Sequence, residues 1–167
     1  MSDDTIEATT EATNETGTEA TTEATGGTGT GHRRVSMTRV GPGEYEVTNS
    51  RGGSLRIGSG ESADFTPVEL FLTAIAGCSA VDVDAITSRR AEPTTFDIVA
   101  EGHKARTDEL GNHMTDLAVT FTLRFPEGQA GDRAREMVPR AVTMSHDRLC
   151  TVSRTVQLGS PITMTVG

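Results

Sequence analysis

The chain has 167 residues, and its 15 basic and 24 acidic side chains give a net charge of −9 and a pI near 4.9. Such acidity argues against a protein that binds nucleic-acid phosphates or anionic membranes. The sequence shows no run of the roughly 18 apolar residues that a membrane helix requires. Its first residues, MSDDTIEATT, lack the basic and apolar regions of a secretory signal. We therefore expect a soluble, cytoplasmic protein.

The acidity is concentrated in residues 1–31, which contain seven acidic residues, eleven threonines and no basic residue. Glutamate recurs there every four residues from Glu7 to Glu23, a spacing that would stack like charges on a helix. The segment also offers too few apolar side chains to offset the entropy cost of ordering. We predict a disordered, solubilising tail over residues 1–31 and a single domain over residues 32–167.

The domain begins with three short segments of alternating apolar and polar residues, at 35–40, 45–48 and 55–57. Turn residues separate them, with Gly-Pro-Gly at 41–43 and two glycines at 52–53. Alternation over a few residues between turn signals is typical of half-buried strands. The sequence therefore predicts an antiparallel meander.

A long helix is predicted next. Thr66 as N-cap, Pro67 at the first helical position and Glu69 closing a capping box form a strong start signal. Residues 70–81 carry no charge, and the basic pair Arg89-Arg90 suits the end of a helix. A helix that is apolar on all sides is normally buried, so we expect this one to be the central, buried helix of the fold.

The remaining elements are predicted in this order: strands at 95–106 and 115–125, helices at 132–149 and 151–158, the latter ending at Gly159, and a strand at 161–166. Pro139 lies inside the first of these helices and should kink or break it. The resulting order, βββ-α-ββ-α-α-β, predicts an α+β fold in which helices are segregated onto antiparallel sheets.

The side chains best suited to take part in a reaction are the two cysteines, Cys78 and Cys150. Two cysteines in a cytoplasmic protein do not indicate a structural disulfide framework. If the small residues around Cys78 let the second long helix approach closely, the two thiols could meet. The alternative is that both are unrelated small buried side chains, and the residues alone leave both interpretations open.

A reactive thiol must ionise. Cys78 follows the helix start at Thr66 by about 18 Å along the axis, too far for the helix dipole to act on it, so a cation would have to lower its pKa. The candidate cations are Arg39, Arg51, Arg56, Arg148 and Arg154. His146 lies one helical turn before Cys150 and could contact it. The histidines show no zinc-type spacing with the cysteines, and no metal site is predicted.

Two segments resemble the OsmC/Ohr family of osmotically inducible and organic hydroperoxide resistance proteins. The first, Thr66-Pro-Val-Glu-Leu-Phe-Leu followed by Ala76-Gly-Cys-Ser-Ala-Val-Asp-Val83, is similar to the family's central helix. The second, Ser145-His and Cys150-Thr-Val-Ser153, is similar to its second cysteine motif. The resemblance covers about residues 35–167 and is closest to the OsmC-like branch with a Pro-x-Glu-Leu and Gly-Cys-Ser pattern.

This resemblance implies an intertwined homodimer, with active sites at the subunit interface, that acts as a thiol peroxidase without metal or organic cofactor. Cys78 matches the peroxidatic cysteine and Cys150 the resolving cysteine. The family's glutamate ten residues before the first cysteine is replaced here by Val68, with Glu69 one position later. The activating arginine of the family has no clear counterpart, although Arg39 lies in the corresponding region.

Two hypotheses follow. The first is a peroxidase that reduces organic or inorganic hydroperoxides through a Cys78 sulfenic acid and a Cys78–Cys150 disulfide, which an external dithiol reductant resets. The second is a non-catalytic dimer that binds a small apolar ligand or senses redox state.

Overall fold

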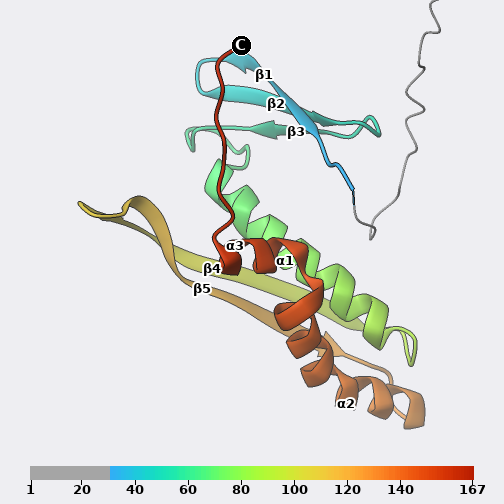
Figure 1. Cartoon of the computed structure of the whole chain (residues 1–167). Helices are drawn as coiled ribbons and strands as arrows, with labels where there is room; N and C mark the ends of the chain where they lie inside the picture. The colour runs from blue at the N-terminus through green and yellow to red at the C-terminus, as the bar shows by residue number, and fades with distance from the viewer. Residues whose placement is uncertain (1–30) are drawn as a thin grey trace, which may run out of the picture.

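The computed structural model describes residues 31–167, so the tail predicted over residues 1–31 lies, except for Gly31, outside the described residues. The described part combines a three-stranded and a two-stranded antiparallel sheet with helices. In Figure 1, the long helix α1 (Pro67–Thr87) starts beside the three-stranded sheet and then runs along the two-stranded one. The predicted α+β class with antiparallel sheets is confirmed.

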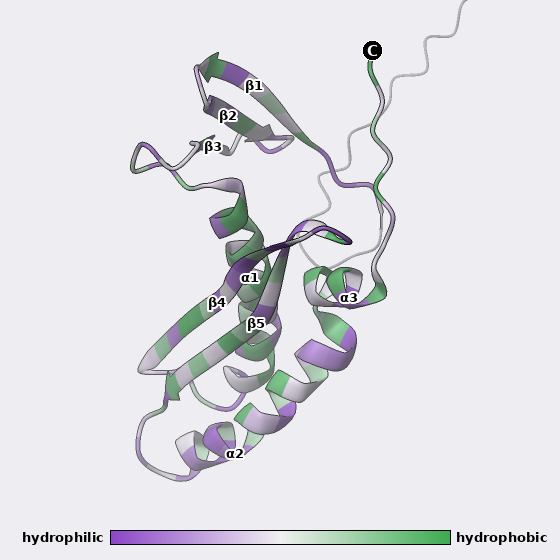
Figure 2. Cartoon of the chain, turned by 90° about the vertical axis from the view of Figure 1, so that its left-hand side faces the viewer, coloured by the Kyte–Doolittle hydropathy of each residue, from purple (hydrophilic) through white to green (hydrophobic). Residues whose placement is uncertain are grey.

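The three-stranded sheet is the predicted meander. It consists of β1 (Val35–Gly41), β2 (Glu44–Asn49) and β3 (Ser54–Ile57), which pair antiparallel in chain order. Gly43, in the turn between the first two strands, has a φ of 70°, a conformation that favours glycine. Figure 2 shows that the meander stands apart from the helices except at the start of α1.

Helix α1 begins at the predicted capping box. The Thr66 hydroxyl oxygen accepts a hydrogen bond from the Glu69 N–H at 3.3 Å, and the Glu69 carboxylate accepts one from the Thr66 N–H at 2.7 Å. The Thr66 backbone N–H, and then its hydroxyl, lower the pKa of Glu69, because both donate to the charged carboxylate. The helix ends at Thr87, just before Arg89-Arg90.

The two-stranded sheet is a long hairpin of β4 (Thr95–Thr107) and β5 (Gly111–Arg124). Both strands were predicted, but β5 begins four residues earlier than expected, because the turn is closed by Gly111 at a φ of 66°. The register shifts at Gly102, where a side chain would come within 2.8 Å of the Leu117 side chain. Helix α1 packs along β4.

Three helical pieces follow: α2 (Gln129–Met144), the π-helical turn η1 (Ser145–Leu149) and α3 (Thr151–Leu158), which ends at the left-handed Gly159. The expected kink or break at Pro139 is not a break, since α2 continues through this residue and the helix changes to π-helical geometry only after Met144. A proline removes one backbone hydrogen bond. The buried Ala134 and Ala141, which lie on either side of Pro139 in a helix that packs against α1, compensate for this loss.

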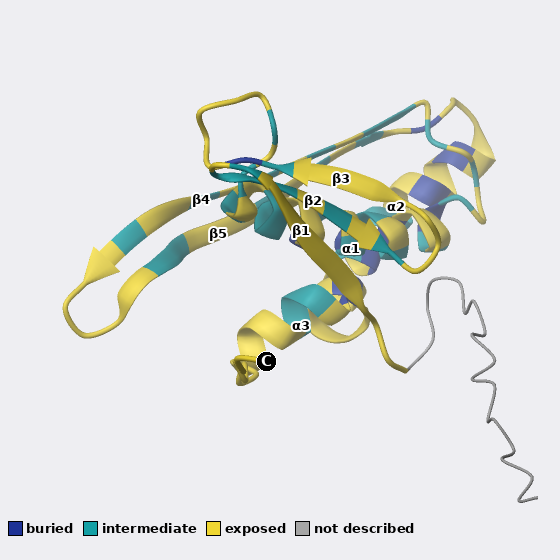
Figure 3. Ribbon diagram, turned by 90° about the horizontal axis from the view of Figure 1, so that it is seen from above, coloured by how far each residue is buried: buried dark blue, intermediate teal, exposed yellow. Residues whose placement is uncertain are grey.

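The prediction that α1 is buried on all sides is also wrong. Its buried residues, Ile75, Ser79, Val83 and Thr87, recur every four positions and therefore form one face, whereas Val81 is 58% exposed. Figure 3 shows buried positions gathered on α1 and α2 and almost none in the meander. Within the described chain, α2, α3 and the hairpin cover only one side of this apolar helix.

By length and composition alone, α1 would also suffice to cross a membrane, and it is the one such helix in the described residues. The expectation that no segment is long and apolar enough for a membrane helix is therefore corrected. A central helix of a soluble protein passes the same test, and α1 carries Glu69, Asp82 and Asp84 along its length.

The last predicted strand, at residues 161–166, is not formed. This segment makes no ladder with any strand of the described chain, and Ile162, Met164 and Val166 are more than four-fifths exposed. In Figure 1 it extends away from α3 to the C-terminus as an unpaired segment. Its alternating pattern suits a strand, but a strand needs a neighbouring edge to satisfy its backbone groups.

Candidate active site

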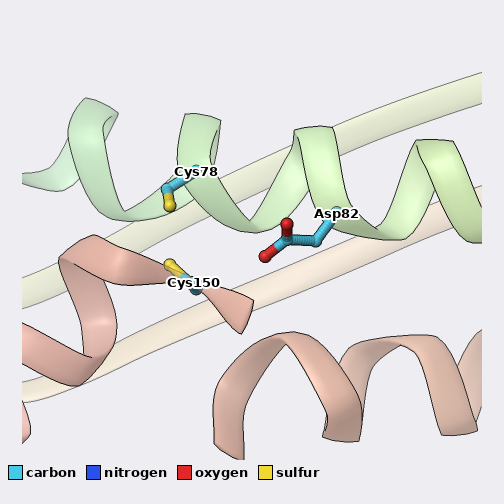
Figure 4. A group of neighbouring side chains, drawn as sticks. All are labelled: Cys78, Asp82 and Cys150. Atoms are coloured by element: carbon cyan, nitrogen blue, oxygen red, sulfur yellow. The ribbon is translucent and has the colours of Figure 1, made fainter. Parts of the chain in front are cut away.

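The fold brings the two cysteines together. Cys78 lies in the middle of α1, and Cys150 lies between η1 and α3, where that chain segment packs against α1. Asp82, one helical turn after Cys78, points toward the same place (Figure 4). The two sulfur atoms and a carboxylate oxygen of Asp82 all lie within 4.8 Å of one another. The sequence left open whether the thiols meet, and the structure places them side by side as free cysteines.

Cys150 is fixed by its backbone. Its N–H donates to the Ser145 carbonyl oxygen at 2.9 Å, which closes the π-helical turn. Its sulfur then serves as the N-cap of α3 and accepts a hydrogen bond from the Ser153 N–H at 3.4 Å. The residue is fully buried. A thiol in the N-cap position faces the positive end of the helix, which favours its thiolate form.

Two serine hydroxyl groups flank the Cys150 sulfur, with Ser153 Oγ at 3.1 Å and Ser79 Oγ at 3.5 Å. Burial raises the pKa of Cys150, but hydrogen bonds from Ser153, Ser79 and the Cys78 thiol outweigh burial and bring its pKa below the ordinary value. Within the single chain, Cys150 is therefore the thiol that ionises first.

Cys78 is the more accessible of the two thiols, since it is half-buried. Burial raises its pKa, and the nearby Cys150 and Asp82 raise it further because they carry negative charge when ionised. The Val152 N–H opposes these effects without overcoming them. The groups that surround Cys78 in one chain therefore do not activate it, and a positive charge close to its sulfur would favour the thiolate.

The candidate cations do not supply that charge. Among the described residues, no arginine is one of the main causes of the pKa shift of either thiol. Arg56 pairs instead with Glu44 at 2.8 Å and Asp64 at 3.4 Å in the meander region. The other candidates lie on exposed strands or turns or, for Arg154, beside Gln157: Arg39, Arg51, Arg148 and Arg154.

Two further sequence-based candidates have other partners. His146 is exposed and lies 3.5 Å from the Gln157 side-chain nitrogen, so the suggested contact with Cys150 is not the one that the structure forms. Glu69, one position after the residue that replaces the family glutamate, is held in the capping box of Thr66. No carboxylate from this part of α1 is therefore directed at the thiols.

An apolar cavity of about 470 Å³ adjoins the thiol pair. Ser79 and Ser153, both of which hydrogen-bond with the Cys150 sulfur, form part of its wall. The rest of the wall comes mainly from apolar side chains of α1, the β4–β5 hairpin and α3, including Leu72, Ile75, Phe121 and Val156. Neither cysteine is part of this wall, so a small ligand in the cavity would lie against the two serines that contact the Cys150 sulfur.

Four residues of the site lie within the two segments that resemble the family, but the sequence assigned them no role: Asp82, Ser79, Ser145 and Ser153. One signal was available for Asp82, because residues four apart share a helix face and Asp82 follows Cys78 by that spacing. Ser145, which donates to the Asp82 carboxylate at 2.9 Å, is 63 positions away and is placed there only by helix packing.

A family model described as OsmC-like protein matches residues 58–165, well over half of the chain. Among curated proteins, no sequence matches. Solved structures do match. A hypothetical protein from Aquifex aeolicus VF5 is 20% identical, with a TM-score of 0.61, and the match covers 78% of this chain and 91% of that one. An OsmC-like protein of unknown function from Vibrio cholerae has the same TM-score at 11% identity, with 77% and 95% covered.

A third solved structure, an organic hydroperoxide resistance protein OsmC from Legionella pneumophila, is 16% identical, with a TM-score of 0.51 and coverage of 75% and 89%. At such identities these structures establish the fold, and the family model matches both cysteine segments.

Proposed function

The chain belongs to the OsmC-like protein family, and from this membership we propose that it is a thiol-dependent peroxidase that reduces hydroperoxides with Cys78 and Cys150. The observation that carries the proposal is the distance between the two sulfur atoms, which are at most 4.8 Å apart although they come from different helices. A disulfide requires sulfurs about 2 Å apart and Cα atoms within about 7 Å. Only a small local movement separates the reduced pair from that geometry.

The proposed reaction has three steps. The Cys78 thiolate attacks the terminal peroxide oxygen, the O–O bond breaks, and the alkoxide takes up a proton to leave as an alcohol; Cys78 becomes a sulfenic acid. The Cys150 thiolate then attacks the Cys78 sulfur and expels hydroxide, which is protonated to water, so that a disulfide forms. An external dithiol reduces the disulfide and is itself oxidised.

Accessibility supports this division of roles. The attacking sulfur must be reached by a peroxide, and Cys78 is half-buried whereas Cys150 is fully buried. The resolving sulfur needs only to reach its neighbour, and a lowered pKa keeps Cys150 available as a thiolate for that step. The hydrogen bonds that the Ser79 hydroxyl and the Ser153 N–H donate to the Cys150 sulfur are suited to maintaining this state.

We propose further that the working unit is a homodimer. The uncovered side of α1 and the unpaired segment 161–166 both expose apolar side chains that a second copy of the chain would cover. A second subunit would also be a source of the positive charge that Cys78 lacks within one chain, with Arg39 as the first candidate. In this proposal the reaction takes place in the cytoplasm, whose dithiol reductants reset the disulfide.

The substrate class follows from the cavity beside the thiols. Its wall is predominantly apolar, and its volume of about 470 Å³ suits a small organic molecule. Organic hydroperoxides, which combine an apolar body with a reactive polar end, fit this site better than hydrogen peroxide. The same cavity favours the second candidate function, a non-catalytic protein that binds a small apolar ligand.

Mass spectrometry of the intact, reduced protein after one equivalent of cumene hydroperoxide separates the two functions. A peroxidase loses two hydrogen atoms as the Cys78–Cys150 disulfide forms, and an equivalent of the corresponding alcohol appears. A protein that only binds the compound remains a free dithiol, and this result would overturn the proposal.

A further inference from the structure

The thiol pair has a third member with a different chemistry. Asp82 is not needed for any step of the proposed peroxidase reaction, yet its carboxylate lies within 4.8 Å of both sulfur atoms. We propose that Cys78, Asp82 and Cys150 form a binding site for Zn²⁺ when both cysteines are reduced. This inference does not depend on the proposed peroxidase activity.

The donor set matches the preferences of zinc. Two thiolates and one carboxylate are common ligands of Zn²⁺, with bond lengths of about 2.3 Å to sulfur and about 2.0–2.2 Å to oxygen. In a tetrahedral site these lengths place two sulfur ligands roughly 3.8 Å apart. Since the three donor atoms already lie within 4.8 Å of one another, side-chain rotations that move each atom by less than about an ångström would bring them into range.

The ligands are held by a second layer of hydrogen bonds. The Ser145 hydroxyl donates to Asp82 Oδ2 at 2.9 Å and so holds the orientation of the carboxylate. The hydroxyl groups of Ser79 and Ser153 contact the Cys150 sulfur. Ser145 is only 1% exposed and Cys150 is fully buried. Groups that orient metal ligands in this way are typical of metal sites, and their loss weakens binding.

The charge of the three side chains also favours a bound cation. When the cysteines are ionised, Cys78, Asp82 and Cys150 place three negative groups in one partly buried space. A divalent cation would relieve this repulsion. Thiolate ligands select soft and borderline metals, so Mg²⁺ and Ca²⁺, which prefer oxygen ligands, should not compete.

The site contributes three protein ligands, which leaves a fourth position for water. Zinc bound there would occupy both sulfur atoms, and neither could then attack a peroxide or its partner. On the proposed function, therefore, Zn²⁺ inhibits peroxide reduction and protects the reduced pair from oxidation. Formation of the disulfide removes both thiolate ligands and so excludes the metal.

Cobalt provides the direct test, because Co²⁺ replaces Zn²⁺ in such sites and absorbs light. Reduced protein freed of metal with a chelator is titrated with Co²⁺ under argon. We expect one equivalent per chain to bind with a thiolate-to-cobalt charge-transfer band and the intense visible bands of tetrahedral coordination, and a stoichiometric amount of Zn²⁺ to abolish both. Absence of the charge-transfer band would overturn the inference.

Variants identify the ligands. Asp82→Asn should weaken Co²⁺ binding at least about tenfold, whereas Asp84→Asn, which changes an exposed aspartate two positions along the same helix, should leave it unchanged. Equal binding by the two variants would contradict the role of Asp82. Wild-type protein alkylated with iodoacetamide should lose the charge-transfer band. This experiment tests the thiol ligands without relying on the folding of a variant.

The outcomes also separate this inference from the proposed function. A protein that binds the metal but, when reduced and freed of metal, does not reduce peroxide would refute the peroxidase and leave the zinc site intact. Peroxide reduction that one equivalent of Zn²⁺ fails to slow, in protein that shows no cobalt charge-transfer band, would refute the zinc site alone.

Discussion

The two cysteines differ in access and in charge, and this difference makes their substitution asymmetric. Cys78→Ser should abolish consumption of cumene hydroperoxide, since a serine hydroxyl without an adjacent base is a far weaker nucleophile than a thiolate. Cys150→Ser should still consume about one equivalent, because the more exposed Cys78 remains, and should then stop as a sulfenic acid or a more oxidised form. Peroxide consumption and intact mass measure both effects.

Equal loss in the two cysteine variants would contradict the division of roles, and loss only in Cys150→Ser would reverse it. The second result has a physical basis, because Cys150 is the thiol with the lowered pKa in a single chain. Accessibility and ionisation thus favour different cysteines for the first step, and the experiment decides which property governs the reaction.

The hydrogen bonds to the Cys150 sulfur give a second prediction. Ser153→Ala removes a hydroxyl 3.1 Å from that sulfur, so the pKa of Cys150 should rise and the thiolate fraction at neutral pH should fall. Ultraviolet thiolate absorbance against pH, recorded with a chelator present and in the Cys78→Ser background, isolates this titration. Ser160→Ala, which changes an exposed serine just beyond α3, is the control and should match the unmodified background.

At the level of secondary structure, the capping box of α1 links stability to pH. The folded-state pKa of Glu69 is lowered by its hydrogen bonds from Thr66, so the ionised carboxylate stabilises the fold. This contribution is fully present above the ordinary glutamate pKa and is lost as the pH falls through the lowered folded-state pKa. Glu69→Gln should therefore reduce the free energy of unfolding at neutral pH and have a smaller effect in acid.

Urea denaturation at neutral and acidic pH measures that difference, with Glu92→Gln, an exposed glutamate beyond the helix, as the control. Thr66→Ala should cost about 1 kcal/mol of stability, as expected for loss of an N-cap side chain. A Glu69→Gln effect that did not shrink in acid would show that the carboxylate charge is not what stabilises the cap.

How far the sequence predicts each element depends on how local its determinants are. The start of α1 at Thr66 and the end of α3 at Gly159 were predicted, because each relies on contacts within a few residues. The possible break at Pro139 does not occur, since the packing of α2 on α1 outweighs one lost hydrogen bond. The sequence could suggest that the cysteines meet but could not establish it, because their proximity depends on how the chain after α2 packs across α1.

The same reasoning explains what sequence patterns could not provide at the site. Ser145 and Asp82 are distant in the chain, and their hydrogen bond arises from helix packing. The alternating residues 161–166 and the apolar residues 70–81 were interpreted as a paired strand and a buried helix segment. In the single chain the segment 161–166 is exposed and the helix is covered on one side only, and in the proposed homodimer a second copy would cover both surfaces.

At the scale of the whole molecule, these uncovered surfaces predict the state of assembly. Val81 on α1 is 58% exposed, and Ile162 and Met164 in the C-terminal segment are 83% and 89% exposed. Large contiguous apolar surfaces on one chain are typical of protein interfaces. In a C2 homodimer each of the two chains would bury these surfaces in the shared interface. Light scattering of the reduced protein should therefore give twice the 17.6 kDa mass of one chain.

Two variants test where the contact lies. Val81→Glu places a charge on the uncovered side of α1, and burying an unpaired charge in an interface is costly, so the dimer should dissociate. Leu110→Glu, at an exposed position in the hairpin turn of β4 and β5, should remain dimeric. If Cys78 draws its activating charge from the second subunit, the Val81→Glu monomer should also lose the rapid first step with cumene hydroperoxide. A wild-type protein of monomer mass would refute the homodimer. An active Val81→Glu monomer would mean that one chain activates Cys78 by itself.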